Sequence, residues 1–245
     1  SLGARLARFL AQPARGRTQI ATSTPDRLAA TLMPGDVLLV EGNSRFSVAI
    51  KYLTQSTWSH SALYVGDALG QSTPDDEAPT LVEADVLEGV HTVKLSEYSG
   101  LHTRICRPVG LSYDDRRKVI AYAIARIGNR YDLKHVIDLT RYLFPMPPVP
   151  VRWRRRMLAL GSGDPTRAIC STLIAQAFES VGYPILPNVT VQAREDRVGA
   201  KCYREQLHIR HYSLYVPRDF DVSPYFQVVK PTIAQGFDYR AINWS

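Results

Sequence analysis

The chain has 245 residues and is 45% hydrophobic, enough apolar material for one large domain or two small ones. Its 30 Lys and Arg against 23 Asp and Glu give a net charge of +7, which favours contact with acidic surfaces and says nothing about fold. This excess is mild, and no zinc-finger, RNA-binding or helix-turn-helix pattern accompanies it, so we expect no nucleic-acid partner. No run approaches the roughly 18 apolar residues of a membrane-spanning helix. The compartment stays open, because a signal peptide or anchor removed ahead of Ser1 is compatible with the sequence.

The N-terminal part of the chain is basic and amphipathic. Residues 1–17 carry four arginines and no acid, and a short apolar stripe runs through them. We expect a basic helix within residues 1–30 that docks on the body with its arginines in water. The alternative is a helix that lies on an acidic or membrane surface.

Residues 20–110 read as turns and short strands. Pro25-Asp26 and residues 33–36 are turn signals, and the second leads into a buried strand at 37–40. A short helix is expected at 46–53, followed by a strand at 61–66. Alternation at 81–86 places Val82 and Ala84 on one face and Glu83 on the other. Further strands at 89–93 and 103–106 suggest an antiparallel sheet.

The second half adds helices and a strand-like tail. Ser112 begins a capping box for a helix that Gly128 closes. The proline-rich run 145–150 cannot be helical. A helix from Cys170 ends at Gly182, and residues 212–216 look strand-like. This order predicts one α+β domain over 1–245, an antiparallel sheet packed against helices, with a C-terminal extension at 200–245.

Cys170 stands in the first turn of its predicted helix, next to the positive end of the helix dipole. That position and nearby backbone N–H groups stabilise a thiolate, which would make Cys170 a nucleophile. The alternative is a small core residue, because free cysteine is commonly buried. The chain's other cysteines are Cys106 and Cys202. A disulfide between those two and three reduced thiols both remain open.

A nucleophilic cysteine needs a histidine to relay its proton and a polar group to orient the imidazole. Among six histidines, His60 is the best candidate because it stands where a polar turn enters an apolar strand, and His91 is second. Glu83 is a lone carboxylate on an apolar strand, 23 residues after His60, and a half-buried acid requires a partner. A satisfied structural histidine and a solvent-facing Glu83 are the alternatives.

Five segments together resemble the circularly permuted branch of the NlpC/P60 papain-like superfamily, the YiiX/YebB-type cysteine hydrolases. They are Pro-Gly-Asp-Val-Leu-Leu (34–39), Trp-Ser-His-Ser-Ala-Leu-Tyr-Val-Gly (58–66), Leu-Val-Glu-Ala (81–84), Gly-Asn-Arg-Tyr-Asp (128–132) and Cys-Ser-Thr-Leu-Ile (170–174). The histidine strand precedes the cysteine helix, as in the permuted order, within a core of about 32–185. The resemblance implies a papain-like α+β fold with Cys170, His60 and Glu83 at the catalytic positions.

The family's ordinary members cleave peptide bonds in bacterial cell-wall stem peptides, so the resemblance implies a cysteine peptidase or amidase. Permuted relatives of the lecithin:retinol acyltransferase type move fatty acyl groups, and an acyl-lipid thioesterase, hydrolase or acyltransferase is the alternative. This chain has Cys-Ser-Thr where those relatives have Asn-Cys-Glu-His-Phe, and Glu83 where they place a further histidine. A non-catalytic binding module is a second alternative.

The chemistry requires no metal and no cofactor. Backbone N–H groups at the start of the Cys170 helix would hold the oxyanion, with Ser171, Tyr64 or Tyr131 as candidate helpers. A metal site built from His208, His211 and Cys202 is a weaker idea, because one His-x-x-His half with a single cysteine is poor evidence. An anionic or lipid-like ligand is suggested by the basic cluster around Trp153, whose alternative is a solvated loop: Arg152, Arg154, Arg155 and Arg156.

Overall fold

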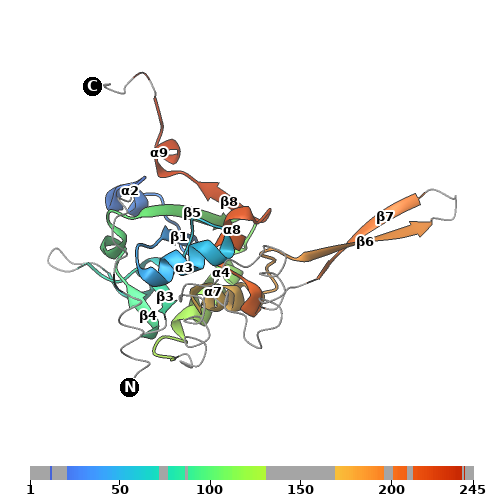
Figure 1. Cartoon of the computed structure of the whole chain (residues 1–245), viewed down its shortest axis with the longest axis horizontal. Coiled ribbons are helices and arrows are strands. Elements are labelled where there is room, and N and C mark those ends of the chain that lie inside the picture. Colours follow the sequence, from blue (N-terminus) through green and yellow to red (C-terminus); the bar gives the residue numbers. More distant parts are fainter. Residues whose placement is uncertain are drawn as a thin grey trace, which may run out of the picture.

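The computed structural model describes residues 12, 21–71, 77–85, 88–130, 169–195, 201–208, 212–238 and 240. Its centre is a six-stranded antiparallel sheet with the order β4-β3-β2-β1-β5-β8 (Figure 1). The strands of this sheet are β1 (Val37–Glu41), β2 (His60–Tyr64), β3 (Leu81–Asp85), β4 (Gly89–Val93), β5 (His102–Pro108) and β8 (Phe226–Val229). The α+β prediction is confirmed.

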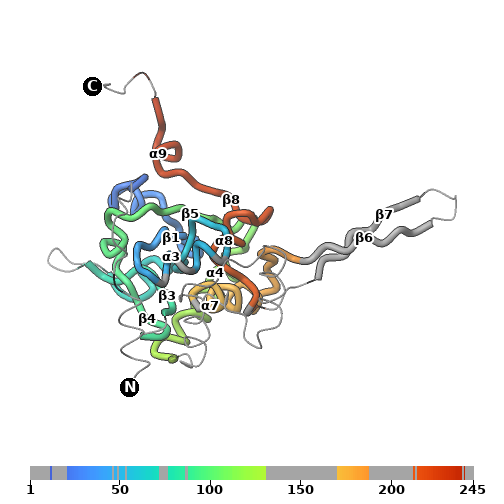
Figure 2. The backbone as a smooth tube through the Cα atoms, in the orientation of Figure 1, coloured from blue at the N-terminus to red at the C-terminus, as the bar shows by residue number. Residues whose placement is uncertain are grey.

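The remaining elements surround or extend this sheet. The α-helices are α2 (Pro25–Ala29), α3 (Arg45–Thr54), α4 (Tyr113–Ile124), α7 (Ile169–Glu179), α8 (Pro217–Val222) and α9 (Pro231–Ala234). Short 3-10 helices are η1 (Gly66–Leu69), η2 (Leu95–Tyr98) and η3 (Tyr212–Leu214), and a separate hairpin pairs β6 (Asn188–Glu195) with β7 (Lys201–His208). Figure 2 shows that β8, from the C-terminal part of the chain, lies beside β5 from the first half.

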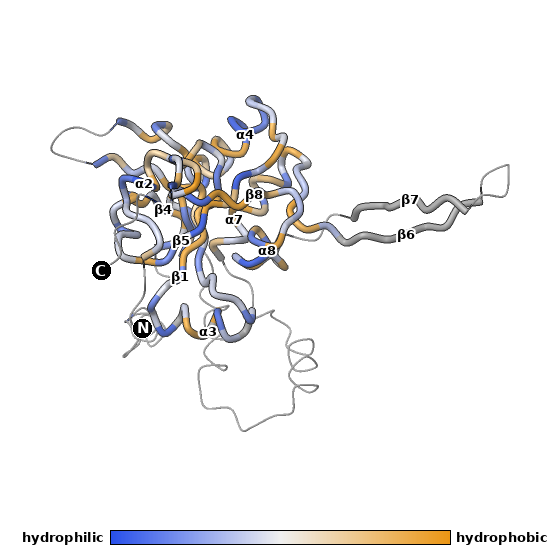
Figure 3. Tube along the Cα trace, turned by 90° about the horizontal axis from the view of Figure 1, so that it is seen from above, coloured by the Kyte–Doolittle hydropathy of each residue, from blue (hydrophilic) through white to orange (hydrophobic). Residues whose placement is uncertain are grey.

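The two faces of the sheet bury different clusters. On one face, Val82 and Ala84 pack with the fully buried Leu173 and Phe178 of α7. On the other face, Leu81 packs with a second cluster that includes Leu28, Tyr98 and Ile105. The predicted alternation along β3 is therefore confirmed, and hydrophobic residues concentrate where the sheet meets α7 (Figure 3).

A buried ion pair ties the loop before β1 to β5. Asp36 is 1% exposed, and the Arg107 guanidinium donates to both of its carboxylate oxygens at 2.7–3.2 Å. Arg107 also donates to the Thr31 carbonyl at 2.7 Å. The tight turn ahead of Asp36 uses Gly35 at φ +92°, a conformation that favours glycine. This arrangement fixes the start of β1.

Several sequence predictions need correction. Pro25-Asp26 is not a turn but the start of α2, because the Thr24 hydroxyl accepts the Arg27 N–H and caps a helix. Residues 212–214 form a 3-10 helix instead of a strand. Cys106 is a free, buried thiol, so the alternative with a Cys106–Cys202 disulfide is wrong. The basic helix of residues 1–17 and the runs 145–150 and 152–156 lie outside the described residues, apart from Gln12. Across the described part, no helix is long and apolar enough to cross a membrane.

Candidate active site

The site begins with Cys170, the second residue of α7, where the cluster on one sheet face holds the helix against β2 and β3. Its side chain is buried, with 4% of the residue exposed. Burial alone would raise the pKa of the thiol, but His60 and the backbone N–H and hydroxyl of Ser61 lower it below its usual value. The net effect favours the thiolate, which is the nucleophilic form.

His60, the first residue of β2, joins the thiol to a carboxylate. Its Nε2 lies 2.5 Å from Glu83 Oε2, and its ring also hydrogen bonds with Cys170. Because Glu83 occupies Nε2, the contact with the sulfur falls to Nδ1. Burial opposes a charge on His60, but Glu83 and Cys170 outweigh it and raise the pKa of the imidazole well above its usual value. The two pKa shifts together favour a thiolate on Cys170 and an imidazolium on His60.

Glu83, on β3, is the centre of the polar cluster. One oxygen, Oε2, accepts hydrogen bonds from His60 and from the buried Tyr98 hydroxyl. The other, Oε1, lies 3.1 Å from His91 Nε2. Burial would raise the pKa of this carboxyl, but its three partners, His60 first among them, hold it far below the usual range. Glu83 is 8% exposed and does not face solvent.

Sequence reasoning missed two members of this cluster. Tyr98 lies on η2, and its hydroxyl donates a hydrogen bond to Glu83. No pattern in the sequence indicates this contact. Ser61 had a signal: it follows His60 on a strand, so its side chain points to the opposite face of the sheet, where Cys170 and Ser171 lie. His91, second among the histidine candidates, is paired directly across from Glu83 in the β3–β4 ladder.

The candidate oxyanion residues separate in the structure. Ser171 is fully buried beside Cys170, with its hydroxyl 3.9 Å from Cys170 Sγ and 3.5 Å from Ser61 Oγ. Tyr64 is four residues after His60 on β2, which is roughly 13 Å along the strand. Burial and the charges of Asp67 and Asp36 raise the pKa of its hydroxyl. The structure therefore does not bring Tyr64 to the sulfur. Outside the described residues lie Tyr131, Arg152, Arg154, Arg155 and Arg156.

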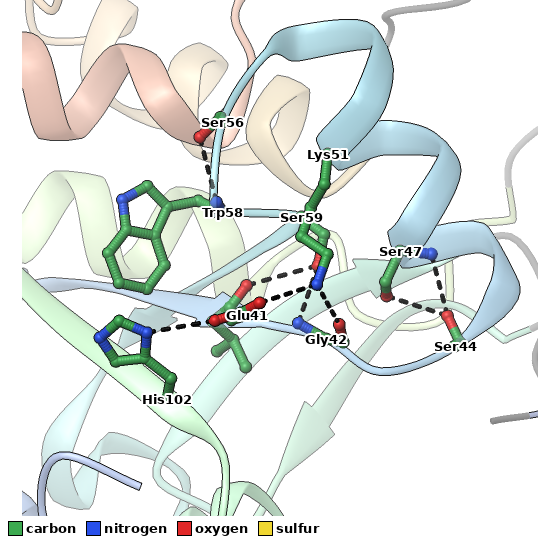
Figure 4. A network of polar contacts seen from close by, with 10 residues as sticks. Glu41, Gly42, Ser44, Ser47, Lys51, Ser56, Trp58, Ser59 and His102 are labelled. Atoms are coloured by element: carbon green, nitrogen blue, oxygen red, sulfur yellow. Dashed lines mark hydrogen bonds and ion pairs between the residues drawn. The ribbon is translucent and has the colours of Figure 1, made fainter. Parts of the chain in front are cut away.

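A second polar network supports the segment that carries His60 (Figure 4). Glu41, at the end of β1, lies 2.9 Å from Lys51 Nζ and 3.2 Å from His102 Nδ1. The Ser59 hydroxyl accepts the Gly42 N–H at 2.8 Å, and the Ser59 N–H bonds to the Val40 carbonyl. The two Ser59 contacts hold the chain immediately before His60 against the end of β1.

The described residues give no support for a metal site, because no three His, Cys, Asp or Glu side chains among them are placed to hold an ion. His211 and the side chains of Cys202 and His208 lie outside the description.

An antiparallel sheet that offers histidine and carboxylate to a cysteine in the first turn of a helix is the arrangement of papain-like cysteine hydrolases. Residues 31–144 match the family described as permuted papain-like amidase enzymes, YaeF/YiiX, C92 family. The match confirms the predicted resemblance to the permuted papain-like hydrolases of the YiiX type, and the matched family is one of enzymes. The matched segment contains His60, Glu83 and His91, and Cys170 lies beyond it.

The chain is also similar to a solved structure, that of metalloprotein yiiX from Escherichia coli O157:H7. The two are 16% identical with a TM-score of 0.44, over 80% of this chain and 96% of the other. No curated protein matches the chain.

Proposed function

We propose that the protein is a cysteine amidase or peptidase in which Cys170 is the nucleophile, His60 the proton carrier and Glu83 the group that orients His60. The observation that carries this proposal is the position of the His60 ring, which hydrogen bonds with Cys170 on one side and Glu83 on the other. The amidase family that residues 31–144 match supports an amide as the scissile bond.

The reaction follows from the charges of these groups. The Cys170 thiolate attacks the substrate carbonyl, and backbone N–H groups in the first turn of α7 stabilise the oxyanion. When the tetrahedral intermediate collapses, the C–N bond breaks and the His60 imidazolium gives its proton to the leaving amine. Neutral His60 then takes a proton from water, whose oxygen displaces the thiolate from the acyl-enzyme and releases the carboxylic acid. Glu83 keeps the Nε2 proton of His60 in place throughout.

We infer bacterial cell-wall peptides as the first substrate class to test, because the ordinary relatives named by the sequence resemblance cleave them. Purified protein is incubated with cell-wall stem peptides and, in parallel, with acyl lipids and acyl thioesters. Turnover of a peptide amide supports the proposal. Turnover confined to acyl lipids would replace the amidase by an acyl hydrolase that uses the same three residues.

The matched pair of variants is Cys170→Ala and Cys106→Ala. Burial raises the pKa of the Cys106 thiol far above its usual value, so Cys106 should be inert and its variant should keep activity. Cys170→Ala should lower turnover at least about a thousandfold, as loss of a covalent nucleophile does. Full turnover by Cys170→Ala, with the fold confirmed by circular dichroism, would refute the proposal.

A further inference from the structure

Both ring nitrogens of His91 face groups that only accept hydrogen bonds. Nδ1 lies 3.1 Å from the Gly89 carbonyl oxygen, and Nε2 lies 3.1 Å from Glu83 Oε1. A neutral imidazole has one N–H and can satisfy only one of these acceptors, whereas an imidazolium has two. Turning the ring over would place carbon atoms against both acceptors. The geometry therefore selects the doubly protonated, positively charged form of His91.

We propose that His91 is a positioning residue. Its imidazolium, held on Oε1 of Glu83, sets the pH range in which the Cys170–His60 pair is charged. This inference rests on the proposed function, since it concerns the same pair. Glu83 then lies between two cations, with His60 on Oε2 and His91 on Oε1. Nothing in the covalent chemistry changes, and no proton leaves His91 during the reaction.

The electrostatic effect of His91 has a definite sign for each member of the pair. A positive charge near the site stabilises the Cys170 thiolate, which lowers the pH at which it forms. The same charge repels the His60 imidazolium and offsets part of the attraction of Glu83, which lowers the pH at which His60 loses its proton. Removing the charge should therefore move both limits of the active range to higher pH.

The groups that act on His91 come from several elements. Glu83 and Asp85, both on β3, each raise the pKa of His91, and its bond to the Gly89 carbonyl acts in the same direction; the pKa reaches about 9. His60 and Tyr98 bind the same Glu83 carboxylate as His91, and Cys170 hydrogen bonds with His60. At neutral pH these contacts hold the proton on His91.

The backbone acceptor of His91 is itself fixed by a neighbouring segment. Gly89 has φ +80°, and a Cβ built there would lie 2.2 Å from the Asn129 carbonyl oxygen. That oxygen accepts the Val90 N–H at 2.9 Å, and the Gly128 N–H donates to the Val90 carbonyl at 2.8 Å. The Gly128-Asn129 segment after α4 therefore fixes the start of β4. It thereby fixes the Gly89 carbonyl, which accepts the hydrogen bond from His91 Nδ1.

The test follows the rate of Cys170 alkylation by iodoacetamide against pH, read by mass spectrometry of the Cys170 peptide in the full chain. This readout needs no substrate. His91→Gln keeps a donor for Glu83 and removes the charge, and His91→Lys keeps the charge. The matched control is His102→Gln, which removes a half-buried histidine paired with Glu41 in the other network (Figure 4).

The profile has two limbs, one set by formation of the Cys170 thiolate and one set by loss of the His60 proton. In His91→Gln we expect both limbs to move to higher pH by about half a unit or more, since a neighbouring charge shifts a pKa by about one unit or more at close range. His91→Lys should move the limbs back toward the wild-type positions, and His102→Gln should leave them in place. Unmoved limbs in His91→Gln would overturn the inference, as would a shift in His91→Lys as large as that in His91→Gln, because the effect would then come from shape and not charge.

Two further results separate this inference from the proposed function. If wild-type Cys170 alkylates only in the range of an ordinary thiol, the thiolate–imidazolium pair is absent and the proposed function fails with it. If a wild-type low-pH limb exists and His91→Gln leaves it unchanged, only the role of His91 fails. Should the variants not fold, nitrogen-15 NMR of wild-type histidine rings decides: His91 must stay doubly protonated at pH 7.5, and a neutral ring there would overturn the inference.

Discussion

At the scale of single residues, Glu83 is the side chain on which the most contacts converge. Its two oxygens accept hydrogen bonds from His60, His91 and Tyr98, although it is a buried acid on a strand that is otherwise apolar up to that point. A buried carboxylate is costly unless it is paired and hydrogen bonded, and these three partners meet that requirement. Glu83 therefore both orients His60 and ties β2, β4 and η2 to β3.

Replacing this carboxylate by an amide should lower the catalytic efficiency. Glu83→Gln keeps the size of the side chain but loses its charge, so the His60 imidazolium loses its main stabilising partner. We expect kcat/KM to fall by about a hundredfold to ten-thousandfold, as when the orienting acid of a triad is neutralised. Steady-state kinetics on the substrate found by screening measures this.

The control for that substitution is Glu88→Gln, on the exposed turn between β3 and β4, where the wild-type rate should be kept. A fall of less than threefold in Glu83→Gln would show that His60 does not depend on this carboxylate.

At the scale of elements, what the sequence predicted well has a local cause. The β1, β3 and α7 segments were found from alternation, apolar runs and helical spacing, because each buries a face whose period is visible in a few residues. The pairing of His60 with Glu83 was found because a lone acid on an apolar strand demands a partner. By contrast, the contact of Tyr98 with Glu83 depends on how η2 folds back, which no local period encodes.

The same distinction explains why β8 was not predicted and why the start of α2 was predicted as a turn. The β8 strand is a short edge strand of four residues, paired with β5 more than 100 positions earlier, and its pattern is too brief to be recognised. In α2, helix capping by Thr24 outweighed the turn preference of Pro25-Asp26, since proline is well tolerated in the first turn of a helix.

The joint between the loop before β1 and strand β5 should be important for stability. Asp36→Asn removes the charge that pairs with Arg107, whose side chain is 22% exposed, and weakens the hydrogen bonds that the guanidinium donates. Loss of hydrogen bonds to a charged group typically costs about 1.5–3 kcal/mol, so we expect a loss of that order in the free energy of unfolding. Chemical denaturation measures it.

As a comparison, Asp115→Asn breaks the pair with Lys118 on the surface of α4 and should change stability little. Equal losses in the two variants would mean that the Asp36–Arg107 pair is no more important than a surface contact.

At the scale of the whole molecule, the site lies where the two faces of the sheet meet around β2 and β3. The cysteine helix α7 packs on the face of Val82 and Ala84, whereas Tyr98 belongs to the cluster on the other face. His60 and Glu83 connect the two sides, since His60 bonds Cys170 and Glu83 bonds Tyr98. If the proposed function holds, stability and catalysis share the same buried charges, and both should depend on pH through them.

The sign of that dependence follows from the direction of each pKa shift. The pKa of His91 is raised from 6.5 to about 9, so its stabilising contribution is complete below pH 6.5 and is lost as pH rises towards 9. The raised pKa of His60 acts in the same direction. The pKa of Glu83 is lowered from 4.5, so its contribution is complete above pH 4.5 and is lost in more acidic solution. Between pH 4.5 and 6.5 the cluster contributes fully.

We therefore expect the free energy of unfolding of the wild-type protein to fall between pH 6.5 and 9, and to fall less steeply in His91→Gln. The two curves should differ most near pH 6 and approach each other above pH 9, because wild-type His91 is then neutral as well. Urea denaturation at half-unit steps of pH measures both curves. Parallel curves for the wild type and His91→Gln would mean that His91 binds its proton no more tightly in the folded protein than in the unfolded chain.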